Sequence, residues 1–171
     1  MNRNRDFGSI LKTNPRSQKI HHLVVLSCYK EPIEVLKTTI DSIANQTMAS
    51  STTMVVSFEE KSPNWSEKQS ELWKFYGSSF HDLFFTVHPF GIPNEIPGKC
   101  SNCNCGIRTA VGHIRRKLGE QNFDSDNLII TTCDADSKFH PRFLEALTLQ
   151  FLNEKDPHSC VFQVNLIVRI T

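Results

Sequence analysis

Two aspartates, Asp134 and Asp136, stand two positions apart at the end of an aliphatic stretch, in the segment TTCDADSKFH. On an extended strand their side chains lie on one face about 6.6 Å apart, where two carboxylates repel by about 2–3 kcal/mol at an effective dielectric of about 20. Water at a strand end absorbs much of this repulsion, whereas a divalent cation with phosphate oxygens turns it into attraction. Because Mg²⁺ and Mn²⁺ prefer oxygen ligands, the pair indicates a candidate metal site.

Further acidic residues follow two earlier strands. Glu31 comes after the apolar run at 22–28, and Glu59 and Glu60 come after the run at 53–58. In open parallel sheets, ligands bind beyond the carboxyl ends of the strands. We therefore expect these acids to converge with Asp134 and Asp136 on one rim of a sheet.

The elements that must position these acids alternate along the chain. Strands are expected at 22–28, 53–58, 83–87, 128–133 and 160–164, and helices at 33–46, 65–75 and 104–118, with a further helix beginning at Pro141. A loop rich in proline and glycine is expected at 89–98. Strands alternating with helices form βαβ units, so the predicted fold class is α/β, a mainly parallel sheet with helices on both faces.

Length and composition set the outer limits. The chain has 171 residues, with 19 Lys+Arg against 18 Asp+Glu, which fits one domain and does not favour nucleic acid as a partner. Residues 1–20 are basic and are expected to form a flexible tail, with the domain at 21–171. No stretch has the roughly 18 apolar residues of a membrane span. The sequence therefore predicts a soluble chain in a cytosol-like compartment, with its cysteines reduced.

Two common phosphate-binding patterns are excluded. The Gly98-Lys99 pair is not a P-loop, because Cys100 follows the lysine and because Pro93 and Pro97 remove backbone donors. No Gly-x-Gly-x-x-Gly motif is present, which weakens a dinucleotide-binding interpretation.

Cysteines and histidines give no recognisable site. The Cys100, Cys103 and Cys105 group lacks the second well-spaced pair that a closed zinc site requires, so packing roles are favoured. The histidines at 81, 88, 113 and 140 share no ligand spacing, and no Gly-x-Ser-x-Gly elbow is present. Structural or exposed roles are expected for these histidines.

Taken together, four motifs in order resemble the nucleotide-sugar half of a family 2 glycosyltransferase, an inverting group with the GT-A (Rossmann-like) fold. The likeness covers about residues 22 to 165. The motifs are the Tyr-x-Glu element in LSCYKEPIEVLKTTIDSIANQT, the acidic pair, the Gly-Lys-x4-Asn-x-Gly element in GKCSNCNCG, and the Asp-x-Asp motif. The residues that carry them are Tyr29, Glu31, Glu59, Glu60, Gly98, Lys99, Asn104, Gly106, Asp134 and Asp136.

The resemblance implies a role for each motif. Asp136 would coordinate Mn²⁺ or Mg²⁺, and Asp134 would contact the ribose or the water shell of the metal. The residues that would bind a UDP-sugar donor are Tyr29, Glu31, Glu59, Lys99 and Asn104. Of these, Glu59 would lie near the base of the nucleotide. The implied reaction is displacement at the anomeric carbon by the hydroxyl of an unknown acceptor, with inversion.

The family's downstream catalytic acid and its Gln-x-x-Arg-Trp acceptor motif are not present before Thr171. The resemblance therefore predicts a front half that binds donor and metal but transfers sugar poorly, with membrane association only through a missing C-terminal region. Two alternatives remain: a truncated, non-catalytic nucleotide-binding fragment, and a phosphatase of the haloacid dehalogenase type. The phosphatase is disfavoured because its Asp-x-Asp normally follows the first strand.

Overall fold

The computed structural model describes residue 11 and residues 13–162. Four strands alternate with helices along this part of the chain. The strands are β1 (His21–Cys28), β2 (Thr52–Glu59), β3 (Asp82–His88) and β4 (Leu128–Asp134). The α-helices are α2 (Ile33–Ala44), α3 (Trp65–Tyr76), α4 (Lys99–Leu118) and α5 (Phe143–Asn153). Short 3-10 helices are η1 (Ser17–Lys19), η2 (Ala49–Ser51), η3 (Ser125–Asn127) and η4 (Pro157–Ser159).

The four strands form one parallel sheet in the order β3-β2-β1-β4. β1 lies inside the sheet and pairs with β2 and β4, and its seven residues from His22 to Cys28 are buried. Such a continuous apolar run is typical of a strand covered on both faces. After β3 the chain crosses back and adds β4 on the other side of β1, so the topological switch point lies between β1 and β4. The predicted α/β class is confirmed.

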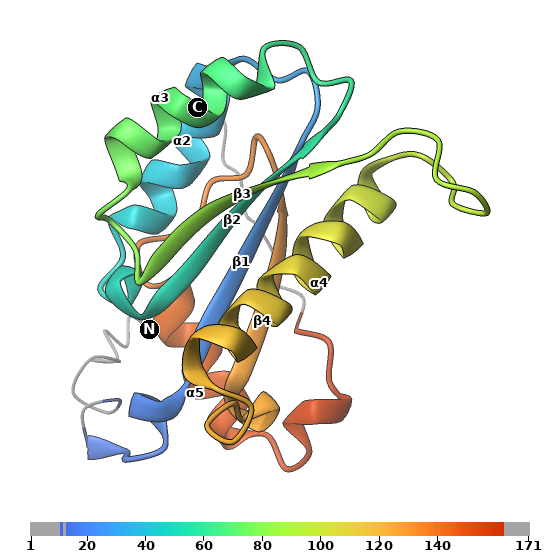
Figure 1. Cartoon of the computed structure of the whole chain (residues 1–171). Helices are drawn as coiled ribbons and strands as arrows, with labels where there is room; N and C mark the ends of the chain where they lie inside the picture. Colours follow the sequence, from blue (N-terminus) through green and yellow to red (C-terminus); the bar gives the residue numbers. More distant parts are fainter. Residues whose placement is uncertain (1–10, 12, 163–171) are drawn as a thin grey trace.

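Helices cover both faces of the sheet (Figure 1). α2 and α3 pack on one face, where their apolar side chains meet Val24 and Leu26 of β1, and Leu144 of α5 joins the same core. α4 packs on the opposite face against Leu23 and Val25. Successive residues of a strand point to opposite faces, so one short strand supplies both cores.

α4 approaches the sheet along a line of residues four positions apart. Asn102, Gly106, Ala110 and Ile114 are all buried. A Cβ atom added to Gly106 would lie 3.0 Å from Cγ1 of Val25, tighter than most real contacts. The missing side chain therefore lets the helix lie close to β1 and β2.

The same helix leaves one strip of the sheet uncovered. α4 contacts β1, β2 and β3. On β4, Ile130 is 42% exposed, and Thr132 and Asp134 are also exposed. An open strip therefore runs along β4 and ends at Asp134.

Several predicted boundaries need correction. α4 begins at Lys99 rather than at 104, because its first turn packs through the small polar residues Ser101 and Asn102, which the hydrophobic pattern does not register. α5 begins at Phe143 rather than at Pro141, since Pro141 and the next residue form a turn that the Phe143 N–H closes on the carbonyl of His140.

Two predictions near the chain ends also change. In the predicted strand at 160–164, residues 160–162 are not in a strand, and 163–164 lie outside the described residues. Within the predicted tail, Leu11, Ser17 and Ile20 are buried, and Ile20 packs against α5. Apolar contact with α5 therefore anchors the chain just before β1.

Candidate functional site

The carboxyl ends of the strands form one rim of the sheet, and β2 extends two residues further along it than β4. Ser27 of β1 pairs with Asp134 of β4, and Glu59 of β2 pairs with His88 of β3. β1 separates Glu59 from Asp134, and Glu59 also lies two residues further along its strand, so their backbones are about 12 Å apart. The predicted acids therefore share a rim but are spread along it.

Lys99 and Asp134 form an ion pair at one end of this rim, where β4 is the edge strand. Their side chains are 60% and 54% exposed, and the lysine ammonium contacts Oδ1 of the aspartate. Lys99 is the first residue of α4, and Gly98 before it has φ 146°, a conformation that favours glycine. An exposed ion pair adds little stability. The pair is notable for its position instead, because Lys99 lies at the N-terminus of a 20-residue helix.

Asp136 follows in a turn at the end of β4. The N–H of Ser137 donates to the carbonyl of Asp134 at 3.1 Å, and the Asp136 side chain is exposed. Ala135 between the two aspartates is buried and accepts a hydrogen bond from the Thr39 hydroxyl of α2 at 2.6 Å. This anchor to α2 holds the motif in place while its two carboxylates stay at the surface.

Tyr29 and Glu31 shape the turn that follows β1. The backbone N–H of Tyr29 donates to Oε2 of Glu31 at 2.6 Å, and Lys68 of α3 donates to the carbonyl of Glu31 at 2.8 Å. Pro32 then caps α2. The carboxylate of Glu31, which was predicted to bind the donor, thus accepts a hydrogen bond within the turn itself.

Asn104 does not join the Lys99–Asp134 pair. It lies five positions after Lys99 on α4, which turns the two side chains about 140° apart around the helix. Its side chain is exposed. The buried amide of this helix belongs instead to Asn102, which is 1% exposed.

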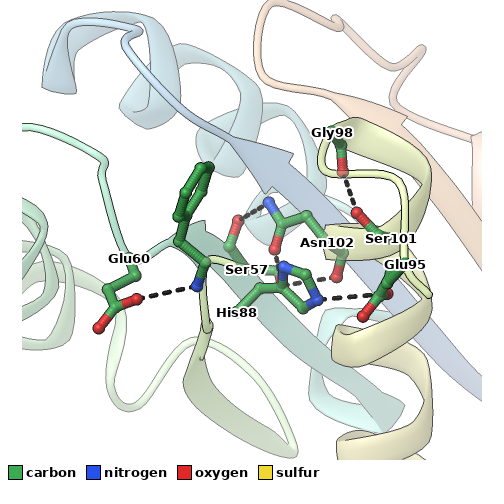
Figure 2. A network of polar contacts seen from close by, with 8 residues as sticks. Ser57, Glu60, His88, Glu95, Gly98, Ser101 and Asn102 are labelled. Atoms are coloured by element: carbon green, nitrogen blue, oxygen red, sulfur yellow. Dashed lines mark hydrogen bonds and ion pairs between the residues drawn. The ribbon is translucent and has the colours of Figure 1, made fainter. Parts of the chain in front are cut away.

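Asn102 ties α4 to the ends of β1 and β2. Its Nδ2 donates to the carbonyl of Ser57 at 2.9 Å and to that of Cys28 at 3.4 Å, and its Oδ1 accepts from the Ser57 hydroxyl at 2.7 Å. Figure 2 shows this side chain reaching from the helix toward Ser57. Sequence reasoning missed Asn102. Its four-residue spacing to Gly106, Ala110 and Ile114 was the available signal.

A second polar group lies at the other end of the rim, where a pocket opens beside the loop after β3. The pocket is lined by Glu59, Glu60, Lys61, His88, Pro89, Phe90, Gly91, Ile92, Glu95, Pro97 and Gly98. Buried His88 lies with Nε2 3.3 Å from Oε1 of Glu95, and Glu60 accepts the N–H of Phe90 at 2.8 Å (Figure 2). The Lys61 ammonium lies 3.1 Å from the centroid of the Phe90 ring. These contacts hold the loop over the end of β2.

Within the described part of the chain, no group of three or more His, Cys, Asp or Glu side chains is arranged to hold a metal ion. A cation at the Asp-x-Asp turn would therefore take two protein carboxylates at most. Mg²⁺ commonly binds through one or two carboxylates and completes its shell with water and substrate phosphates. The residues present fit a cation that arrives with a phosphate ligand.

Among the described residues, no helix has the length and apolar character needed to cross a membrane. A scan against models of known protein families found no match, and a search of curated proteins found no significant relative. The function of this chain is therefore inferred from the α/β sheet and from the side chains at its rim.

Proposed function

We propose that this chain is the donor-binding part of an inverting glycosyltransferase resembling family 2, and that it binds a UDP-sugar together with Mn²⁺ or Mg²⁺. The observation that carries the proposal is the Lys99–Asp134 pair, which joins the start of α4 to the end of β4 at the topological switch point. In open α/β sheets this crevice is the usual ligand position.

The pair offers complementary charges to a metal-bound diphosphate. The first N–H groups of a helix have no partner within the helix, and the helix dipole favours anions there. Lys99 adds a positive charge at this end of α4, while Asp134 and the exposed Asp136 supply oxygen ligands for a cation. A diphosphate bridging lysine and metal would replace the Lys99–Asp134 contact.

We assign the base of the nucleotide to the exposed surface beside the pocket at β3, because the pocket itself has a volume of only about 10 Å³, room for about one water molecule. Phe90 is 55% exposed and offers an aromatic face, and Glu59 and Glu60 offer acceptors for a base N–H. The span of about 12 Å between the backbones of Glu59 and Asp134 suits an elongated ligand better than a single ion. In this arrangement the base lies toward β2 and the diphosphate toward β4.

The proposed reaction is attack by an acceptor hydroxyl on the anomeric carbon, with the metal stabilising the departing diphosphate. The residues assigned here bind the donor, and no catalytic base is assigned to any of them. Without a positioned general base, the expected rate loss is about 10²–10⁴-fold. Binding is therefore the property to measure.

Calorimetric titration of UDP in the presence and absence of Mn²⁺ tests the proposal. We expect Mn²⁺-dependent binding by the wild type and a loss of at least about tenfold in affinity in Asp136→Ala, which is about 1.4 kcal/mol. Asp126→Ala is the matched control, because this aspartate is exposed at the opposite end of β4. Equal UDP affinity in the wild type and Asp136→Ala would refute the metal site, and release of phosphate from a simple phosphoester would favour the phosphatase.

A further inference from the structure

Two cysteines in the first two turns of α4 take no part in the proposed donor site. Cys100 is exposed, and Cys103, three positions later, is half-buried. Residues three positions apart on an α-helix lie on the same side, with Cα atoms about 5 Å apart. Disulfides span Cα separations of about 4.4–6.8 Å. The backbone of α4 therefore already allows a disulfide between these two residues.

A buried hydroxyl, that of Ser27, lies beside the Cys103 thiol. The Oγ atom of Ser27, whose side chain is 6% exposed at the end of β1, has no hydrogen-bond partner within the described residues that meets normal geometry. Ser27 lies against the Cys103 thiol, and the two interact. A buried hydroxyl left in this way is costly unless it serves another group. Its O–H can donate to a thiolate that forms at Cys103.

The two sulfurs differ in access and environment. Burial raises the pKa of the Cys103 thiol, an effect that the Ser27 hydroxyl and the charge of Lys99 oppose. Cys100 is open to solvent next to Lys99 at the start of the helix. Cys100 is therefore the sulfur that a reagent in solution meets first.

We propose that Cys100 and Cys103 are a redox-active dithiol pair, in which Cys100 attacks low-molecular-weight disulfides such as oxidised glutathione and Cys103 resolves the product. The Cys100 thiolate forms a bond to one glutathione sulfur and releases the other as glutathione thiolate. The Cys103 thiolate then attacks the Cys100 sulfur and releases the second glutathione. The protein loses two protons and two electrons, and the small disulfide is reduced to two thiols.

The helix geometry selects this pairing over the neighbouring cysteines. Cys105 lies two positions after Cys103, about 200° away around the helix, so these two sulfurs face different directions. Cys133 of β4 interacts with Cys103, but burial raises the pKa of its thiol to about 12. A reagent in solution therefore has one reachable pair.

The pair belongs to the turn that presents Lys99 to Asp134. Closing the disulfide would restrain this turn. Any resulting change in UDP affinity would depend on the proposed function, whereas the thiol chemistry does not. The test is therefore a measurement of covalent state.

The experiment incubates the folded protein with oxidised glutathione and measures the intact mass, followed by tryptic digestion. Trypsin should release the peptide CSNCNCGIR, which contains Cys100, Cys103 and Cys105. We expect the wild type to lose two hydrogen atoms, reversibly with reduced glutathione, and fragmentation to place the bond between Cys100 and Cys103. Cys105→Ser and Cys160→Ser should behave as the wild type. Cys100→Ser should lose the reaction, and Cys103→Ser should stop at a stable glutathione adduct on Cys100.

Three results would overturn the proposal. The first is a lasting glutathione adduct on Cys100 in the wild type, and the second is a bond to Cys105 or Cys133. The third is no reaction at all in the wild-type protein. Because the decisive readout comes from the wild type, poor folding of any variant does not affect the conclusion.

Discussion

His22 provides a test of the core through pH. Its side chain is fully buried in β1, and Nε2 lies 2.8 Å from Oγ1 of Thr148 on α5. The Thr148 hydroxyl donates its single proton to the carbonyl of Leu144 at 2.9 Å, so it accepts from His22, and Nε2 carries the ring proton. Nδ1 is buried with no partner in the described residues. The ring is therefore held neutral, because protonation of Nδ1 would bury a positive charge and an N–H group without a hydrogen-bond acceptor.

Burial, with a smaller contribution from the charge of His21, lowers the pKa of His22 from 6.5 to about 4. The unfolded chain binds a proton near pH 6.5 and the folded chain does not until about pH 4, so this stabilisation is complete above pH 6.5 and is lost as the pH falls toward 4. The difference between the two pKa values corresponds to about 3 kcal/mol, as an order of magnitude.

Urea unfolding at a series of pH values from above 6.5 down to about 4 measures this effect. We expect the free energy of unfolding of His22→Gln to fall less steeply than that of the wild type, because the amide still donates to Thr148 but does not titrate. The difference should approach about 3 kcal/mol. Parallel curves for the wild type and His22→Gln would refute the reasoning.

Three further substitutions test the packing that positions the rim, each by urea unfolding. Gly106→Ala should destabilise the fold by about 1–3 kcal/mol, because the new Cβ would lie 3.0 Å from Val25. Gly112→Ala on the same helix should stabilise the fold by about 0.5–1 kcal/mol, because its Cβ would meet only the flexible end of an arginine at 3.6 Å. A greater loss of stability in Gly112→Ala than in Gly106→Ala would contradict the close approach of α4 to β1. Asn102→Ala should destabilise by about 2–3 kcal/mol, because it leaves buried carbonyl and hydroxyl groups unpaired, and a change within error would remove Asn102 as the link between α4 and the sheet. Tyr76→Phe should cost about 1 kcal/mol by removing the 2.7 Å hydrogen bond to an aspartate of α2, and an unchanged midpoint would show that water replaces this bond.

The position of the rim could be read from local pattern. Runs such as HHLVVLSC are apolar, rich in β-branched residues and too short for a helix, so they form strands wherever they are buried on both faces. Their alternation with helices implies parallel pairing. Parallel pairing in turn places Glu59 and Asp134, which end β2 and β4, on the same edge. These are consequences of chain order and backbone geometry, and the predicted strands at 53–58 and 128–133 differ from the observed ones by no more than one residue at either end.

What the polar groups of the rim do was decided by tertiary structure. Asn102 and Asn104 are the same residue type two positions apart, yet one is buried and hydrogen-bonded to two strands while the other is exposed. Local pattern reports burial through aliphatic side chains, and the first turn of α4 has few of these, so both its start and its buried amide were missed. The Lys99–Asp134 contact likewise depends on the crossing of α4 from β3 to β4. Polar groups are satisfied by whichever partners the packing brings near, and those partners lie far away in the sequence.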